Sequence, residues 1–195
     1  MSDKNRIIIF DTTITGDLKG ESSWKSPSNI ALVKYWGKKD LQIPKNPSLS
    51  FTLSNCFTIC KIKFSSSNVS NKTEFELYFE GKKAISFEKK MKVFFERIKV
   101  YCPYLSGLKI IVETNNSFPH SSGIASSASA YSALSLCIMD VEKTIDPSLS
   151  SDYFFKKASF LARLGSGSAC RSTFGPLVVW GKSNSFNNSS DLFGT

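Results

Sequence analysis

Alternation of apolar and polar side chains in the first half of the chain restricts the possible fold more than any other feature. The segments SLSFTLS (48–54), ICKIKF (59–64) and EFELYFE (74–80) all show it. Successive side chains of a β-strand point to opposite faces, so the pattern predicts strands with one buried and one wet face. A sheet of such strands needs a second layer to cover its apolar face. The polar stretch 65–72 predicts that the last two segments pair as a hairpin.

Other segments predict the rest of the sheet and its covering layer. Residues 28–36, 108–114 and 176–180 are largely apolar, with β-branched and aromatic residues, which indicates buried strands. In 87–101 and 151–164 apolar residues recur three and four positions apart, as in amphipathic helices. Strands come first and helices then alternate with strands, an order that predicts an α+β fold.

The ends of the two helices carry their own signals. Pro103 ends the first helix, and the second has Ser150, Ser151 or Asp152 as its candidate N-cap. Arg163 is expected on the surface of that second helix. The glycine- and serine-rich stretch 165–175 predicts a turn. The polar tail 183–195 predicts no packed structure, and 41–47, with two prolines, predicts a loop.

The serine-rich stretch SFPHSSGIASSASAYSAL (117–134) joins a predicted strand to a predicted helix. Gly123 lets the backbone turn tightly or approach a ligand closely. The first N–H groups of a helix have no internal partner and its dipole is positive there, so a phosphate is favoured at this point. The stretch matches neither a Walker loop nor a dinucleotide fingerprint. An ordinary serine N-cap, with small residues for close helix packing, explains the same pattern.

Charge and cysteine content exclude several classes of protein. The 25 basic and 16 acidic residues give a net charge of +9, which favours anionic partners such as phosphates or nucleotides. Many lysines come as scattered pairs, without an arginine-rich arm or a basic-aromatic motif, so nucleic acid is not an expected partner. Five cysteines without a CxxC pair argue against a disulfide framework or a zinc site. No stretch is long enough for a membrane span, and a cytoplasmic location is expected.

Three motifs carry a resemblance to a known family. PHSSGIASSASA resembles the phosphate loop of the GHMP kinase superfamily. SPSNIALVKYWGKKD with QIPKNPSLSFTL resembles the N-terminal signature of the diphosphomevalonate decarboxylases in that superfamily, and GSGSACRSTFGPLVVW resembles their second signature. The motifs occur in the family's order and span roughly residues 24–181. Together they are far more specific than any one alone.

The resemblance implies both a fold and a reaction. The fold is the GHMP kinase N-terminal type, a ribosomal-protein-like two-layer arrangement of sheet and helices. Enzymes of this family use ATP and Mg²⁺ to phosphorylate the tertiary hydroxyl of 5-diphosphomevalonate; loss of phosphate and CO2 then gives isopentenyl diphosphate. A phosphomevalonate decarboxylase or a mevalonate 3-kinase of the same superfamily remains an alternative. A non-catalytic nucleotide- or nucleic-acid-binding module is an alternative of another class. A homodimer is compatible with the family.

The matched motifs also imply site residues. Lys34 is expected near the transferred phosphoryl group, where a cation stabilises spreading negative charge. Arg171 is expected to bind the carboxylate or diphosphate of the substrate through its guanidinium fork. The other substrate contacts are expected at Tyr35, Trp36, Gly37, Lys38, Ser166, Gly167, Ser168, Ala169 and Cys170. ATP contacts are expected at Asn116, Pro119, Ser121, Ser122, Gly123, Ser126, Ser127 and Ser129.

Two further residues of these motifs are open to interpretation. His120, the only histidine, stands where relatives often carry threonine; packing of the loop is favoured over a role near the ATP phosphates. Cys170 is interpreted as a small buried neighbour of the site rather than a nucleophile. The sequence does not assign the magnesium ligands.

The motifs divide the chain into an N-terminal extension or edge strand (1–22), an ATP- and substrate-binding domain (23–182) and a tail (183–195) leading to a C-terminal domain. The family's catalytic aspartate, in a stretch resembling Phe-Asp-Ala-Gly-Pro-Asn, has no counterpart here. We therefore expect a chain that is an N-terminal portion, exposes apolar surface and aggregates readily.

From this expectation we predict that the 195-residue polypeptide alone is inactive or nearly so. The measurement is ATP-dependent release of CO2 from 5-diphosphomevalonate. Release at the turnover of an ordinary enzyme would contradict the prediction.

Overall fold

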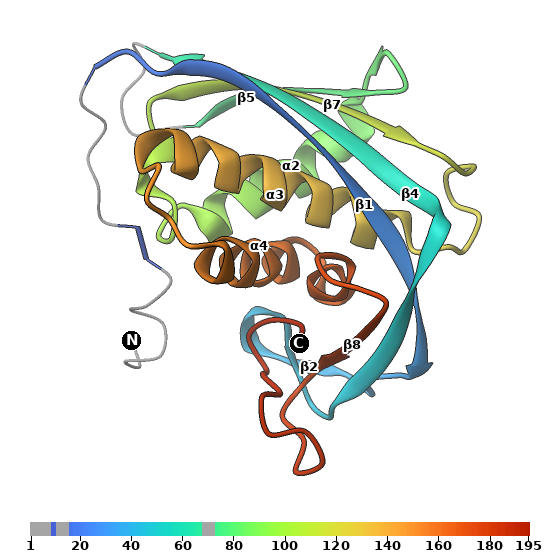
Figure 1. Cartoon of the computed structure of the whole chain (residues 1–195). Helices are drawn as coiled ribbons and strands as arrows, with labels where there is room; N and C mark the ends of the chain where they lie inside the picture. Colours follow the sequence, from blue (N-terminus) through green and yellow to red (C-terminus); the bar gives the residue numbers. More distant parts are fainter. Residues whose placement is uncertain (1–8, 11–15, 68–72) are drawn as a thin grey trace.

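The computed structural model describes residues 9–10, 16–67 and 73–195. Most of the predicted N-terminal extension and most of the predicted hairpin turn lie outside these residues. One curved sheet arches over a layer of helices (Figure 1), which confirms the α+β prediction. The helices are α2 (Ile85–Ile98), α3 (Ser126–Ile145) and α4 (Ser151–Gly165), with short 3-10 segments η1 (Asp40–Gln42), η2 (Pro103–Leu105) and η3 (Gly167–Ser172). The strands are β1 (Lys19–Val33), β2 (Lys38–Lys39), β3 (Ile43–Pro44), β4 (Ser48–Ser66), β5 (Glu74–Phe79), β6 (Lys82–Lys83), β7 (Leu108–Asn116) and β8 (Leu177–Trp180).

The long strand β4 organises the sheet. It pairs antiparallel with β1 along one side, with a register break between Pro27 and Ser28. Its other side is shared by β8, along residues 48–51, and by β7, along residues 58–66. The two predicted strands 48–54 and 59–64 are thus one continuous strand. The predicted alternation holds in its second half, where Cys60, Ile62 and Phe64 are buried.

The predicted hairpin between 59–64 and 74–80 is wrong. Strand β5 pairs in parallel with β7, not with β4. A parallel pair needs a crossover connection, and β6 with helix α2 supplies it. Strand β1 also differs from the prediction of a strand at 28–36. It begins at Lys19 and ends at Val33, so residues 34–36 leave the sheet.

The helices follow the sequence pattern closely. Met91, Phe94, Phe95 and Ile98 form the buried face of α2. Helix α4 begins after Ser150, whose hydroxyl accepts a hydrogen bond from the backbone N–H of Tyr153 at 3.2 Å, which confirms one of the candidate caps. Helix α3 is buried along most of its length because it lies between the sheet and α4. None of the helices in the described ranges is both long and apolar enough to cross a bilayer.

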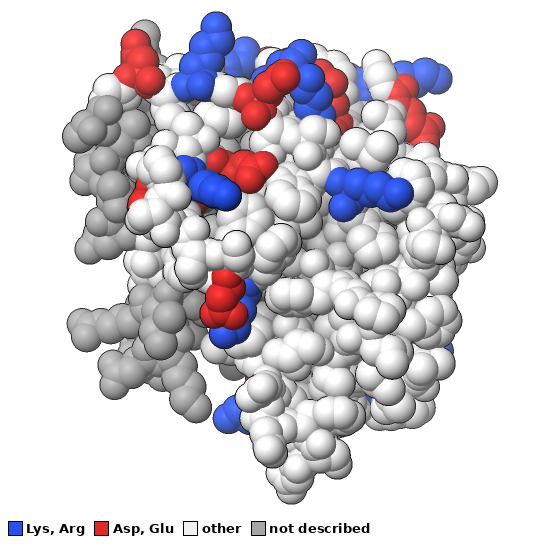
Figure 2. All heavy atoms as spheres, in the orientation of Figure 1, with Lys and Arg blue, Asp and Glu red and all other residues white. Residues whose placement is uncertain are grey.

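The charged side chains in view gather over the upper part of the molecule (Figure 2), where Figure 1 places the beginning of β1 and the end of β4. Cross-strand ion pairs form on the outer sheet face, such as Lys61 with Glu21 and Lys109 with Glu76, both at 2.9 Å. The lower part of the same view is nearly free of charge. The outer face of the strands therefore carries charges of both signs, several of them paired.

Apolar side chains are exposed near the opposite end of the sheet, where β1, β4 and β8 meet. Leu32, Val33 and Leu177 are each more than half exposed, and Trp36 beyond the end of β1 is 83% exposed. This agrees with the expected exposure of apolar surface.

The tail is packed, which contradicts the prediction. Val179 and Thr195 exchange two backbone hydrogen bonds, at 2.7 and 2.9 Å. The carbonyl of Asp191 accepts a hydrogen bond at 3.0 Å from the indole N–H of buried Trp180. The backbone N–H of Gly194 donates to the hydroxyl of Ser159 at 2.9 Å. Long-range partners in α4 and β8 order this polar segment, and periodicity within the segment cannot reveal them.

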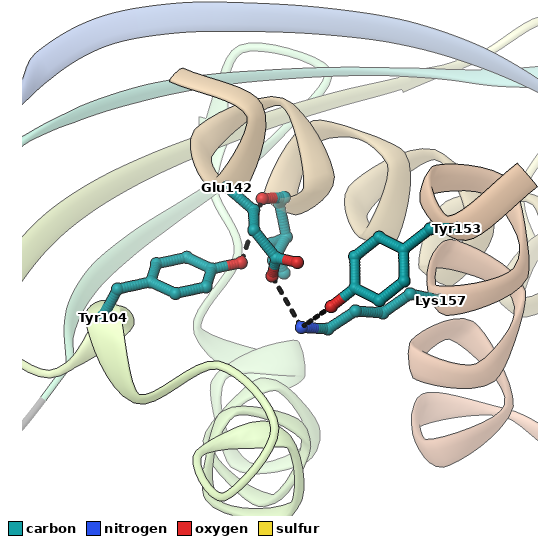
Figure 3. Close-up of polar contacts among 5 residues, drawn as sticks. Tyr104, Glu142, Tyr153 and Lys157 are labelled. Carbon is teal, nitrogen blue, oxygen red and sulfur yellow. Dashed lines mark hydrogen bonds and ion pairs between the residues drawn. The ribbon is translucent and has the colours of Figure 1, made fainter. Parts of the chain in front are cut away.

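A buried ion pair joins α3 to α4 (Figure 3). The ammonium of Lys157 lies 2.7 Å from Oε2 of Glu142 and 3.2 Å from the hydroxyl of Tyr153. Burial raises the pKa of the Glu142 carboxyl, and the neighbouring Lys157 opposes that rise. The other carboxylate oxygen of Glu142 has no hydrogen-bond partner among the described residues. The pair is therefore costly to break from either side.

We predict that Lys157→Met lowers the free energy of unfolding by about 3–5 kcal/mol, because it leaves Glu142 buried and uncompensated. A carboxyl with a raised folded-state pKa favours the fold most when protonated, so this variant loses further stability as pH rises through that pKa. Urea denaturation at several pH values measures both effects. The double variant Glu142→Leu with Lys157→Met should recover most of the loss. A single variant as stable as the wild type would contradict the prediction.

Candidate active site

The predicted turn 165–175 contains η3, which follows directly on α4 and is largely buried. The amide of Asn29, on β1, donates to the carbonyl of Ser168 at 3.1 Å and to the hydroxyl of Ser172 at 2.7 Å. The hydroxyl of Ser159 donates to the carbonyl of Cys170 at 2.7 Å. Hydrogen bonds from β1 and α4 therefore fix the shape of this segment.

Arg171 lies at the end of η3 as a buried cation. Its NH1 donates to the hydroxyl of Ser48 at 2.7 Å, and its Nε has no partner among the described residues. The rings of Tyr35 and Trp180 lie 5.8 and 5.9 Å from its Cζ. Burial lowers the pKa of the guanidinium, and no carboxylate in the described ranges forms an ion pair with it. A buried, always-charged group without a counter-ion favours binding of an anion.

The predicted substrate segment 34–38 lies beside Arg171. Tyr35 packs edge-on against Trp180, with the ring centroids 4.9 Å apart. Asn46 closes this loop, because its side chain accepts from the backbone N–H of Trp36 at 2.6 Å and donates to the carbonyl of Lys34 at 3.1 Å. The segment is thus shaped by backbone contacts, while the indole of Trp36 stands in solvent.

The two predicted lysines of this segment differ in their surroundings. Lys38 is exposed, but its ammonium contacts Gln42, and its pKa is lowered by partial burial and then by the charge of Arg97. Lys34 is exposed just beyond the end of β1. Gly167 packs so closely that an added Cβ would lie 2.9 Å from Cη2 of Trp180 and 3.3 Å from Cδ of Lys38. The structure thus brings Tyr35, Lys38 and Gly167 together with Arg171.

The other members of the second motif have supporting positions. Ala169 and Cys170 are fully buried, and the thiol of Cys170 donates to the carbonyl of Gly167 at 3.1 Å. Burial raises the pKa of this thiol to about 12, so it is protonated at neutral pH. Its position agrees with the interpretation of a buried neighbour rather than a nucleophile. Ser166 and Ser168 are half-buried.

The predicted phosphate loop leads from β7 into α3. Ser121, Gly123 and Ala125 all have a positive φ, at 64°, 80° and 51°. Ala125 precedes α3 in the left-handed region, and no side chain caps the helix. The first N–H groups of α3 thus lack the side-chain partner that a serine N-cap would give. The loop residues Pro119, Ser121, Ser122 and Gly123 are exposed.

A cavity of about 280 Å³ borders the start of α3. Three of the predicted ATP residues line it: Asn116, Ser126 and Ser127. Apolar side chains from β5, α2 and α3 form most of its wall, namely Leu77, Phe79, Phe87, Met91, Ala130, Tyr131 and Leu134, with Lys90, Thr114 and His120. An apolar wall with a few polar groups is typical of small-molecule sites.

His120 and Ser129 have defined surroundings. The imidazole of His120 packs edge-on against Phe79 and Phe87, with centroids 5.5 and 5.3 Å away, which agrees with the packing interpretation. Ser129 is fully buried outside the cavity, 2.6 Å from the hydroxyl of Thr58. Thr58 donates at 2.7 Å to Oδ1 of Asn116. Ser129 therefore supports a cavity residue, and the structure gives its own hydroxyl no access to a ligand.

The two regions adjoin. The hydroxyls of Ser127, at the start of α3, and Ser166, at the end of α4, lie 3.5 Å apart. Ser28 donates to the carbonyl of Ile124 in the phosphate loop, and the next residue, Asn29, holds η3. Neighbouring side chains of one strand thus anchor both the loop of Gly123 and the segment of Arg171.

Sequence reasoning missed several residues of this site. Asn29 and Ser28 stand in the quoted first motif as polar residues beside an apolar run, and that contrast was the available signal. Ser48 and Trp180 also stand in the quoted motifs, but their role depends on the pairing of β4 with β8, which the motifs do not reveal. The described residues hold no group of three or more His, Cys, Asp or Glu side chains placed to bind a metal ion.

Comparison with known proteins gives one consistent result. Residues 26–191 match the family described as diphosphomevalonate decarboxylase-like N-terminal domain. A diphosphomevalonate decarboxylase of Ganoderma lucidum is 36% identical over 172 residues, 82% of this chain and 41% of the relative. A mevalonate diphosphate decarboxylase structure from Enterococcus faecalis, on the mevalonate diphosphate mediated ATP binding mechanism, is 32% identical with a TM-score of 0.70, covering 92% of this chain and 51% of its own. A structure described as MDDEF in complex with MVAPP, AMPPCP and magnesium is 32% identical with a TM-score of 0.68. The match covers 92% of this chain and 50% of that chain.

The geometry of Arg171 generates a prediction that needs no knowledge of the ligand. Inorganic pyrophosphate should raise the melting temperature of the wild-type chain, since a ligand present at a hundred times its Kd adds about 2.7 kcal/mol to the free energy of unfolding. Arg171→Met should abolish most of this increase. Lys61→Met, which removes the same charge from the outer face of the sheet, should retain it. Equal increases in the Arg171→Met variant and the wild type would contradict the assignment.

Proposed function

The chain belongs to the diphosphomevalonate decarboxylase-like family, matching its N-terminal domain, and we propose that it forms the ATP- and substrate-binding part of a diphosphomevalonate decarboxylase. The proposed reaction is the ATP-dependent conversion of 5-diphosphomevalonate to isopentenyl diphosphate, ADP, phosphate and CO2. The chain spans about 41% of the length of the curated relative with which it shares 36% identity.

The acidic substrate would bind beside η3. Arg171 supports this assignment because it is a buried cation with a free Nε and no carboxylate partner in the described chain. Lys38 supplies a second cation, and Tyr35 with Trp180 forms an aromatic wall. A guanidinium fork suits a carboxylate or diphosphate, which offers paired oxygens. The backbone around Ser166 and Ser168 completes the proposed cradle.

ATP would bind in the cavity beside α3. Its apolar wall suits a purine ring, and the uncapped N-terminus of α3 suits the phosphates. Asn116, Ser126 and Ser127 line this cavity, and the loop with Ser121, Ser122 and Gly123 leads to it. When bound, Mg²⁺ would accompany the ATP phosphates and neutralise part of their charge.

The chemistry requires the two ligands to meet. Phosphoryl transfer is catalysed mainly by positioning and by stabilisation of charge on the transferred group. Lys34 is the proposed cation near that group, and Arg171 is the proposed partner of the carboxylate or diphosphate of the acid. The contact between Ser127 and Ser166 carries the proposal, because it places the ATP cavity next to the substrate segment.

Two alternatives make different predictions. A phosphomevalonate decarboxylase would bind the monophosphate in preference to the diphosphate, and a mevalonate 3-kinase would prefer mevalonate itself. A nucleic-acid-binding module would bind polynucleotide with a steep salt dependence. The Lys and Glu pairs on the outer sheet face do not favour the latter. We also propose a cytoplasmic protein and a homodimer, in line with the sequence expectations; all five cysteines are free thiols.

Isothermal titration calorimetry with two variants tests the two sites separately. Ala130→Phe places a ring in the ATP cavity, so we predict at least about tenfold weaker binding of ATP, with 5-diphosphomevalonate binding retained. Arg171→Met should show the reverse. Mevalonate, its phosphate and its diphosphate are titrated in parallel with the wild-type chain. If the wild-type chain binds neither ATP nor any of the three acids, the proposed function is wrong.

A further inference from the structure

Arg163 lies inside the molecule, whereas its helical position predicted the surface. Its side chain is 2% exposed, and burial lowers the pKa of its guanidinium to about 10. The group is thus still a cation at neutral pH. The described part of the chain offers it no carboxylate ion-pair partner. The charge of Asp191 is among the effects that oppose the lowering of its pKa, but it forms no ion pair with the guanidinium, so the contacts that hold this buried cation need an explanation.

The guanidinium bridges two distant segments through their backbone. Its Nε donates to the carbonyl of Leu192, in the tail, at 2.7 Å. Its NH1 donates to the carbonyl of Leu41, in η1. The ring of Phe160, one turn earlier in α4, lies 5.1 Å from its Cζ. One planar fork therefore links α4, η1 and the tail, which a single ammonium group cannot do with the same geometry.

The segment that Arg163 holds would be costly to form alone. Leu41 and Gln42 are adjacent and have positive φ values of 49° and 65°. Neither is glycine, so the surrounding contacts must stabilise this backbone. The side chain of Leu41 is 59% exposed, so its own packing contributes little. The hydrogen bond from Arg163 to the carbonyl of Leu41 is a contact that fixes this turn to α4.

This turn controls the placement of Lys38. Strand β2, which contains Lys38, pairs with β3 immediately across η1. The ammonium of Lys38 contacts the side-chain oxygen of Gln42. Both side chains border Gly167 of η3, since an added Cβ there would lie 3.3 Å from Cδ of Lys38 and 3.4 Å from Oε1 of Gln42. A shift of η1 would thus move Lys38 relative to Arg171.

We propose that Arg163 is a positioning residue that sets the β2–η1–β3 segment against η3, so that Lys38 and Arg171 face one substrate anion. It acts through the carbonyls of Leu41 and Leu192 and does not touch the substrate. The inference rests on the proposed function in one respect, the identity of that anion as 5-diphosphomevalonate.

Hydrogen exchange and calorimetry on the 195-residue chain test the proposal. In Arg163→Met we predict that exchange of the amides in residues 38–44 rises about tenfold or more, while exchange in β7 rises no more than global stability requires. The affinity for 5-diphosphomevalonate should fall at least about tenfold, since small misplacements are costly, and the affinity for ATP should stay within about twofold. Arg163→Lys keeps the charge but not the fork, so its amide exchange and its affinity for 5-diphosphomevalonate should lie between those of the wild type and Arg163→Met. It should fold if Arg163→Met does not.

Lys157→Met is the matched control. It removes a second buried cation from α4 that contacts Glu142 and Tyr153 but not η1. At matched stability it should leave exchange in 38–44 and the ratio of the two affinities unchanged. If Arg163→Met resembles this control, or if Arg163→Lys equals the wild type, the proposal is wrong. If the wild-type chain fails to bind 5-diphosphomevalonate, the proposed function fails, and the exchange data still decide the role of Arg163.

Discussion

The polar side chains that β1 turns inward determine how the rest of the molecule is arranged. Ser28 holds the phosphate loop and Asn29 holds η3. The hydroxyl of Ser26 lies 2.6 Å from that of Ser132 and 2.7 Å from the carbonyl of Ser172. Each such bond contributes about 1 kcal/mol net, but a buried group left without its partner costs more. Moving either loop away would therefore cost more free energy, through unpaired buried groups on β1, than the observed hydrogen bonds contribute.

Buried cations supply a second constraint at the same end of the molecule. Arg163 lies in α4 and Arg171 in the adjoining η3, and neither forms an ion pair with a carboxylate among the described residues. Their partners differ in a way that separates their roles. Two backbone carbonyls hold the fork of Arg163, whereas Arg171 donates to one serine and keeps an unpaired Nε. The fold supplies the partners of Arg163, and we propose that a ligand supplies the missing partner of Arg171.

The proposed ATP cavity and the proposed acid-binding segment come from different parts of the fold. Strands β5 and β7 with helices α2 and α3 form the cavity, and β1, β4, β8 and η3 form the other region. Helices α3 and α4 join them, tied at the far end by the ion pair of Glu142 and Lys157 and at the near end by Ser127 and Ser166. A substitution in one of the two proposed sites can therefore leave the residues of the other site unchanged.

The sequence by itself determined the α+β class, the three helices and the motifs of both regions, and it limited the N-cap of α4 to Ser150, Ser151 or Asp152. These features depend on local periodicity, capping and residue identity, which act over a few positions. Only the tertiary structure decided that β5 pairs with β7, that 183–195 packs, and that Arg163 is buried. Each depends on partners far away in sequence, such as the crossover through α2 or the carbonyls of Leu41 and Leu192. No pattern within a short window contains that information, because the free energy comes from contacts that exist only once the chain has folded.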